Sequence, residues 1–236
     1  MNQDKIAELN RGITAAFINQ STLSNLAYKP QFISNNYREG KKVLSSIEDE
    51  LLSCEEFYIS AAFITMGGIT PLLQTLKELE QRGILGKILT TDYLTFSDPK
   101  ALRLLAGFRN IELKMFVTEN SNEGFHTKGY IFKKEELYRI IIGSSNMTLR
   151  ALTTNREWNA KIVSTEQGEY AKDVVSEFEE LWTSDQSFAF EQCIDAYSDL
   201  YTKNKIIQKQ KKIARQAQIP SLEVYRLQPN SMQVGF

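Results

Sequence analysis

The chain has 236 residues, of which 42% are hydrophobic and 24% are charged, and its formal net charge is -1. These values are typical of a folded globular domain, and the near-neutral charge excludes a protein coated with positive charge for non-specific binding of nucleic acid. Cys54 and Cys193 are the only cysteines, which excludes a disulfide framework and a cysteine-rich zinc site.

The hydrophobic pattern along the chain predicts an α/β protein. Apolar residues at helical spacing predict helices, and short apolar runs predict buried strands. In chain order we expect a helix at 5–18, a loop at 24–40, a helix at 41–54, a strand at 57–64, a helix at 69–82, a strand at 87–91, a helix that starts at Asp98, strands at 111–117, 125–132, 138–142 and 157–163, and a helix at 168–182. Strands that alternate with helices predict a sheet with helices on both faces.

Beyond Ser184 the character of the chain changes. Residues 188–217 are expected to form one or two helices, and residues 203–215 contain six basic residues and no acidic one. That basic run is typical of a solvated helix face, although it can also contact a nucleic-acid backbone. We divide the chain into an N-terminal segment (1–40), a main domain (41–183), a helical extension (184–218) and a linker (219–236).

The N-terminus carries no apolar signal core, and no apolar run approaches the ~20 residues that cross a bilayer. We therefore expect a cytoplasmic protein without a membrane partner.

The single histidine, His126, lies in the stretch FHTKGYIF and is followed two positions later by Lys128. Because side chains alternate between the faces of a strand, these two are expected on the same side. Both side chains cost free energy when they are buried without a partner. As a pair they suit an anion, and phosphate above all.

The next predicted strand delivers GSSN, residues 143–146, at its end. Small hydroxyls and an amide there can donate hydrogen bonds to phosphate oxygens, and the glycine permits a close approach of the backbone. The following stretch NREWNAKIV supplies Asn155 and Glu157. A carboxylate near a histidine can orient the imidazole and fix its tautomer.

HTK, then GSSN, then N-x-E resembles the signature of the phospholipase D superfamily. The stretches SAAFIT, ILTTDYLTFSDPKAL, GSSNMTLRALTTNREWN and EFEELW are similar to the nuclease-type domain at the N-terminus of bacterial superfamily II helicases. The chain also resembles the metal-independent restriction nucleases of this superfamily. The likeness covers about residues 25–183 and implies a phospholipase D-like mixed sheet for 41–183. One departure is Lys133, which stands where the family has an aspartate and weakens the case for true phospholipase activity.

The resemblance implies two-step hydrolysis of a phosphodiester without metal or cofactor. One histidine attacks phosphorus to form a phosphohistidine, and a second protonates the leaving oxygen and then activates water. With one histidine per chain, we expect a homodimer whose active site lies at the two-fold interface.

The same resemblance assigns roles to the site residues. We expect His126, Lys128, Asn146 and Glu157 to be catalytic, with Lys128 and Asn146 on phosphate oxygens and Glu157 orienting the histidine. Ser144 or Ser145 is expected to add a hydrogen bond to the substrate, and Asn155 to support the site.

The tail adds a weaker resemblance, because LQPNSMQ is similar to the entry segment of a DEAD/DEAH helicase core, with Gln233 at the adenine-contacting position. No G-x-x-x-x-G-K-[ST] loop is present, so these residues are not expected to hydrolyse ATP. Residues 219–236 are expected to lead toward a helicase core that this sequence does not contain.

The predicted function is therefore a nuclease domain of a DNA-processing helicase. Two alternatives remain open: a catalytically silent module of a helicase that binds nucleic acid or dimerises, and a lipid phosphodiesterase. The sequence does not distinguish DNA from RNA, although DNA is the expected substrate. Tyr93 and Phe96 in DYLTF are expected to pack in the fold, with base stacking as the alternative.

Overall fold

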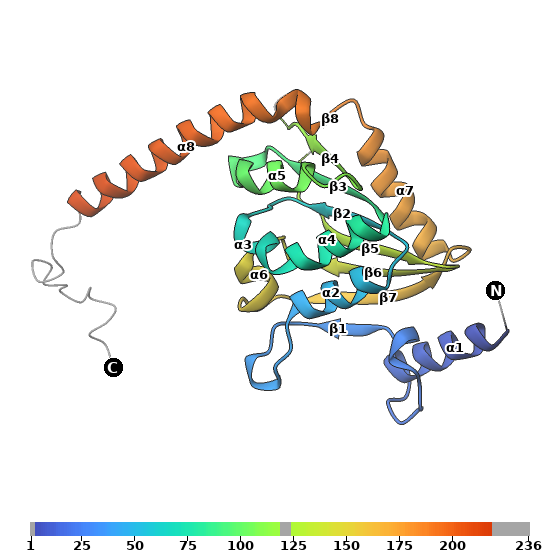
Figure 1. The fold of residues 1–236 in the computed structure, drawn as a ribbon. Helices are drawn as coiled ribbons and strands as arrows, with labels where there is room; N and C mark the ends of the chain where they lie inside the picture. Colours follow the sequence, from blue (N-terminus) through green and yellow to red (C-terminus); the bar gives the residue numbers. More distant parts are fainter. Residues whose placement is uncertain (1–2, 119–123, 219–236) are drawn as a thin grey trace, which may run out of the picture.

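The structure is a computed structural model that describes residues 3–118 and 124–218. Its centre is a mixed sheet with the strand order β1-β7-β6-β5-β2-β3-β4-β8 (Figure 1). The strands are β1 (Gln31–Ile33), β2 (Glu56–Ala61), β3 (Leu85–Thr91), β4 (Ile111–Phe116), β5 (Lys128–Lys134), β6 (Leu137–Gly143), β7 (Asn159–Thr165) and β8 (Ser187–Ala189). β2, β3 and β4 are parallel, and the other neighbouring pairs are antiparallel.

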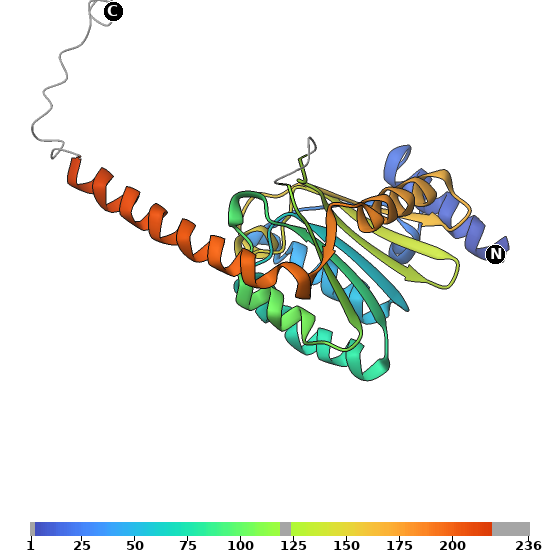
Figure 2. The same ribbon diagram turned by 90° about the horizontal axis from the view of Figure 1, so that it is seen from above.

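Helices cover both faces of the sheet, which confirms the predicted fold class (Figures 1 and 2). The α-helices are α1 (Gln3–Phe17), α2 (Val43–Ser53), α3 (Met66–Ile69), α4 (Leu73–Arg82), α5 (Pro99–Ala106), α6 (Leu149–Thr153), α7 (Glu169–Thr183) and α8 (Phe190–Gln218), and the 3-10 turns are η1 (Leu26–Tyr28), η2 (Tyr37–Glu39), η3 (Thr70–Leu72) and η4 (Tyr93–Thr95). α2, α4, α5 and the start of α8 bury their apolar residues on one face, and α7 packs on the other.

Alternation along β5 divides the core between these two layers. Tyr130 and Phe132 point into the core beneath α2 and α4, whereas Ile131 points toward Phe178 of α7. Each inward-facing side chain is buried, so both faces of the central strands are apolar. This two-sided burial explains why the central strands read as continuous apolar runs in the sequence.

Local signals placed two helix ends correctly and misplaced one helix. The side chain of Asp98 accepts a hydrogen bond from the Lys100 backbone N–H at the start of α5, and Gly83 ends α4 in the left-handed region. The helix expected at 69–82 is wrong in detail, because η3 interrupts it. Pro71 lies in η3 and lacks the backbone N–H that a continuous helix needs there.

Two strands begin later than the sequence predicted. The strand expected at 125–132 starts at Lys128, because its pairing with β2 ends where Ala61 faces Lys128. The strand expected at 157–163 starts at Asn159, which pairs with Gly143 at the end of β6. His126 and Glu157 therefore lie in the connections just before β5 and β7, and not within the strands.

The two edge strands were missed. β1 lies in the segment expected to be a loop at 24–40, and β8 lies in the segment expected to be helical after Ser184. Each has three residues, which is too short for a pattern, and each exists through pairing with β7 or β4. The division of the chain into segments stays a prediction, and the expected linker at 219–236 lies outside the described residues.

Candidate active site

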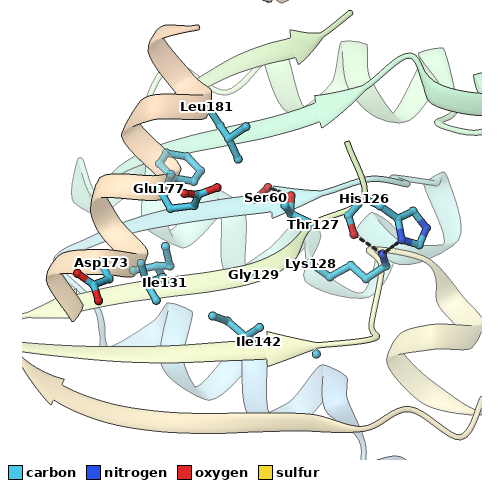
Figure 3. A pocket seen from close by; sticks show the side chains of 13 residues that line it. Ser60, His126, Thr127, Lys128, Gly129, Ile131, Ile142, Asp173, Glu177 and Leu181 are labelled. Carbon is cyan, nitrogen blue, oxygen red and sulfur yellow. Dashed lines mark hydrogen bonds between the residues drawn. The ribbon is translucent and has the colours of Figure 1, made fainter. Parts of the chain in front are cut away.

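The predicted histidine–lysine pair lies at the end of the sheet where β2 and β6 finish and β5 and β7 begin. Lys128 Nζ is 2.9 Å from His126 Nδ1 and donates a second hydrogen bond of 2.6 Å to the backbone oxygen of His126 (Figure 3). An ammonium can only donate, so Nδ1 accepts and the ring carries its own proton at Nε2. The imidazole is exposed, and Nε2 is therefore the nitrogen that can meet a substrate.

Thr127 fixes this pair from the opposite side of the chain. Its side-chain oxygen is hydrogen-bonded to the Ser60 hydroxyl, and its backbone oxygen accepts from the Ala62 N–H at 3.2 Å. Both partners belong to β2 or follow it directly. The residue between His126 and Lys128 thus ties them to the most buried part of the sheet.

Burial lowers the pKa of the Lys128 ammonium, and the nearby Glu157 carboxylate acts in the opposite direction. A partly buried cation with incomplete solvation gains more from an incoming anion than a fully solvated one does. Lys128 is therefore prepared to exchange its contact with the imidazole for a phosphate oxygen.

Ser144 and Glu157 form the second part of the site. Ser144 Oγ donates a hydrogen bond to Glu157 Oε2 and accepts one of 3.1 Å from the Trp158 backbone N–H. Of the two serines offered as alternatives, Ser144 is the one that is exposed. Glu157 was expected to orient the histidine; in the structure its hydrogen bond goes to Ser144 and its charge acts on Lys128.

Gly143 permits the close packing at this point. A Cβ atom at this position would lie less than 3.0 Å from the backbone of Trp158 and from Asn159. The glycine at the end of β6 is therefore required by the approach of β7, a reason that the sequence did not indicate.

Ser145 lies beneath the site and is fully buried. Asn159 Nδ2 donates to Ser145 Oγ at 3.0 Å, and Asn159 Oδ1 accepts from the Ser145 N–H at 3.3 Å. The Tyr130 hydroxyl donates to the Ser145 backbone oxygen at 2.9 Å. Sequence analysis missed Asn159, and the only signal was a polar residue that opens the apolar run NAKIV.

The two predicted asparagines differ in their contacts. Asn146 Oδ1 accepts from the Phe63 N–H at 3.0 Å, so its Nδ2 group is the end free to donate to a ligand. Asn155 is exposed, and its contacts run through the backbone: its N–H donates to Arg150 and its carbonyl accepts from Asn35 Nδ2 at 2.7 Å.

A cavity of about 540 Å³ runs from the site along the α7 face of the sheet (Figure 3). His126 and Lys128 lie at one end, and Asp173 and Glu177 of α7 lie at the other. Its floor is largely apolar, and Gly129 leaves it open by lacking a side chain. The acidic end of this cavity repels a polyanion.

In the described part of the chain, no group of three or more His, Cys, Asp or Glu side chains is arranged to hold a metal ion. Among the same residues, no helix combines the length and apolar character of a membrane span.

Comparison with known proteins gives a family and a fold. The protein-family model described as "Cardiolipin synthase, PLD-like domain" matches residues 49–182, which include the whole site. A search of curated proteins gave no match.

Solved structures of similar fold include NucT from Helicobacter pylori, with a TM-score of 0.54, 17% identity, and coverage of 69% of this chain and 99% of that one. Nuc from Salmonella typhimurium, a phospholipase D family member, has a TM-score of 0.53 and 19% identity over 68% of this chain and 98% of its own. The phosphatidylserine synthase of Haemophilus influenzae has a TM-score of 0.52 and 15% identity over 78% of this chain and 46% of its own.

Proposed function

Since this chain belongs to the phospholipase D-like domain family, we propose that it is a metal-independent phosphodiesterase that cleaves nucleic acid, with DNA as the expected substrate. The observation that carries the proposal is the contact of 2.9 Å between Lys128 Nζ and Nδ1 of the only histidine. In this proposal His126 is the nucleophile, and Lys128 is the neighbouring cation that binds the phosphate under attack. Ser144, Asn146 and Glu157 surround this pair with further polar groups.

In the first step, His126 Nε2 attacks phosphorus, an N–P bond forms, and the P–O bond to the leaving alcohol breaks. Attack needs the lone pair on Nε2, so the ring proton must move to Nδ1. A phosphate oxygen that draws Lys128 away vacates Nδ1 and permits this change of tautomer through solvent. Substrate binding thereby converts the resting imidazole into a nucleophile.

The leaving oxygen needs a proton from a second group. In a symmetric dimer, the general acid is His126 of the partner subunit in its imidazolium form, with a proton on both ring nitrogens; it donates the Nε2 proton to this oxygen and becomes a neutral imidazole. Water then attacks the phosphohistidine, the partner imidazole takes one proton from that water, and the P–N bond breaks. The net reaction consumes one water and yields a phosphomonoester and an alcohol.

Lys128 and the Nδ2 group of Asn146 stabilise charge on the non-bridging oxygens. Ser144 adds a hydroxyl, which Glu157 holds in place by accepting its hydrogen bond. The Glu157 carboxylate also raises the pKa of Lys128 and so opposes the effect of burial. In this scheme Ser145 acts from beneath by fixing the loop, and Asn155 acts through its backbone contacts.

The choice of nucleic acid rests on a likeness to nuclease-type domains that precede helicases, in the stretches SAAFIT, ILTTDYLTFSDPKAL, FHTKGYIF, GSSNMTLRALTTNREWN and EFEELW. A fused helicase core following these residues remains part of the proposal, since LQPNSMQ lies outside the described residues. Such a core would supply the polymer substrate directly.

The test is cleavage of labelled single- and double-stranded DNA and RNA in excess EDTA, which disables contaminating metal-dependent nucleases. We expect cleavage by the parent and none by His126→Ala, with Tyr170→Ala as a control in α7. Mixing parent with His126→Ala subunits tests the dimer, because a shared site makes activity fall with the square of the parent fraction.

A linear fall in the mixing experiment would contradict the shared site. Binding of nucleic acid by a parent protein that cleaves none of the four substrates, alone or joined to its helicase core, would establish the silent binding module instead. Cleavage of phospholipid in preference to all four polymers would favour the lipid phosphodiesterase.

A further inference from the structure

The loop after β3 carries a strained backbone close to His126. Leu94 and Thr95 have φ values of 57° and 47°, in the left-handed region that residues other than glycine rarely adopt. β3 ends at the same end of the sheet as β2, so this loop lies beside the candidate active site. Strain at such a place needs restraint from neighbouring structure.

α8 supplies that restraint. Asn204 Nδ2 donates to Thr95 Oγ1 at 2.7 Å, and the Tyr197 hydroxyl donates to the Ser97 backbone oxygen at 2.7 Å. Ser97 is fully buried and also accepts from the Ile64 N–H through its hydroxyl, at 3.1 Å. The loop is therefore held on both sides and presents its outer residues in a fixed position.

Those outer residues are aromatic and exposed. Tyr93 is 40% exposed and Phe96 is 53% exposed, which disagrees with the expectation that both rings pack in the fold. The Phe96 ring lies 4.8 Å from the Phe63 ring, and the Phe63 and Tyr93 rings lie 5.9 Å and 6.4 Å from the His126 ring. Phe63 and Tyr93 thus lie beside the proposed nucleophile, and Phe96 extends this group from Phe63.

The charges next to this aromatic group differ from those across the site. α8 leaves the loop and projects away from the sheet (Figures 1 and 2), and it has no acidic residue after Asp199. Among the α8 side chains that the structure describes, Lys203, Lys205, Lys209 and Lys211 are exposed. The opposite exit, along α7, ends at Asp173 and Glu177. Asp92 and Asp98 flank the loop itself, and beyond them the lysines of α8 favour a polyanion on this side over the acidic α7 end.

Resting on the phosphodiesterase function proposed above, we infer that Phe63, Tyr93 and Phe96 form a stacking platform for unpaired bases next to the scissile phosphate. The lysines of α8 bind the backbone of the same strand. Aromatic rings beside a basic track are the combination that binds single-stranded nucleic acid, because every unpaired base offers a face for stacking. A base pair within a duplex does not offer this face.

The test measures binding by fluorescence anisotropy in a His126→Ala background, where no cleavage interferes. The probes are a labelled single-stranded oligonucleotide, its duplex, and a single strand with abasic residues. We expect Tyr93→Ala with Phe96→Ala to weaken single-strand binding about 10- to 100-fold and to leave duplex binding within about twofold. Tyr93→Phe with Phe96→Tyr keeps the rings and restores binding. Tyr170→Ala, which removes a ring that is 42% exposed on α7, leaves binding unchanged.

The abasic probe tests the inference without altering the protein. We expect the protein with intact Tyr93 and Phe96 to bind the abasic strand as weakly as the double alanine variant binds the intact strand. The double alanine variant should bind the two strands equally. Equal binding of intact and abasic strands by the parent would overturn the inference, as would no binding of single strands. Loss of the dimer in the double variant, seen by sedimentation, would assign the surface to a second copy and overturn it too.

Cleavage is measured separately, in proteins that retain His126. A parent that binds single strands through their bases yet cleaves none would retain the stacking platform and refute the catalytic proposal. A parent that cleaves intact and abasic strands equally would support the catalytic proposal and refute the stacking platform.

Discussion

Two layers of polar side chains meet at the end of the sheet, and they differ in what their hydrogen bonds achieve. The outer layer consists of His126, Lys128, Ser144 and Glu157, and the inner layer consists of Tyr130, Ser145 and Asn159. Each inner residue is at most 3% exposed and bonds within its own layer. Outer residues are exposed or half-buried, so a ligand can reach them.

The difference separates the groups that fix the geometry of the site from the groups that can contact a ligand. Buried polar groups cost free energy unless they are fully paired, so the inner layer fixes one geometry for the GSSN loop. Outer groups can change partners, as we propose for Lys128 when phosphate replaces the imidazole. Chemistry and stability should therefore respond to different substitutions, and each prediction below tests that separation.

The largest effect is expected from His126→Ala. Because this substitution removes the proposed nucleophile and the proposed acid together, cleavage in EDTA should fall at least about 10³-fold in single-turnover assays. The free energy of unfolding should change by less than about 1 kcal/mol, since the imidazole is exposed. A larger change in urea titrations would show that the outer layer also supports the fold.

Asn159→Ala should instead have its main effect on stability. It removes both side-chain partners of the buried Ser145, and we expect a loss of about 2–4 kcal/mol in the free energy of unfolding by urea titration. Asn155→Ala is the matched control, because Asn155 is exposed, and it should change stability by less than about 0.5 kcal/mol. Equal effects of the two substitutions would remove the distinction between the layers.

These two asparagines also show how far the sequence could predict the molecule. The histidine–lysine pair, GSSN and the acidic residue were identifiable because each is a short motif with its own chemistry. Asn155 and Asn159 are the same residue type four positions apart, and only the start of β7 decides which one is buried. That start was misplaced by two residues, since it depends on pairing with Gly143.

The fold shows the same limit. β2, β3 and β4 were predictable because burial on both faces makes most of their positions apolar, although Lys87, Glu112 and Lys114 interrupt the runs in β3 and β4. The edge strands β1 and β8 have three residues each and no pattern, so only the neighbouring strand defines them. The exposure of Tyr93 and Phe96 likewise depends on backbone strain and on contacts from α8, about 100 residues later.

A smaller effect is expected from Tyr130→Phe, which removes one member of the inner layer's network and keeps the ring. Loss of the hydrogen bond to the buried Ser145 oxygen should lower the free energy of unfolding by about 1 kcal/mol. Tyr170→Phe, at a ring that is 42% exposed, should have no measurable effect. If Tyr130→Phe reduced cleavage far more than stability, the inner layer would also take part in the chemistry.

The smallest effect concerns the charge state of Lys128 and separates two roles within the outer layer. The ammonium is lost as pH rises, and because burial lowers the pKa of Lys128, this loss occurs below the ordinary lysine value of 10.5. The Glu157 carboxylate raises that pKa, so Glu157→Gln should lower it further. Sulfate keeps its charge across this range, and calorimetry of sulfate binding should show affinity failing at a lower pH in Glu157→Gln than in the parent.

Glu169→Gln, an exposed substitution at the start of α7, should leave the pH midpoint of sulfate binding unchanged. An unchanged midpoint in Glu157→Gln as well would mean that Glu157 acts only through its hydrogen bond to Ser144. A lower midpoint would instead show that the carboxylate keeps the phosphate-binding ammonium charged. Glu157 would then act in the outer layer through its negative charge on Lys128 as well as through its hydrogen bond to Ser144.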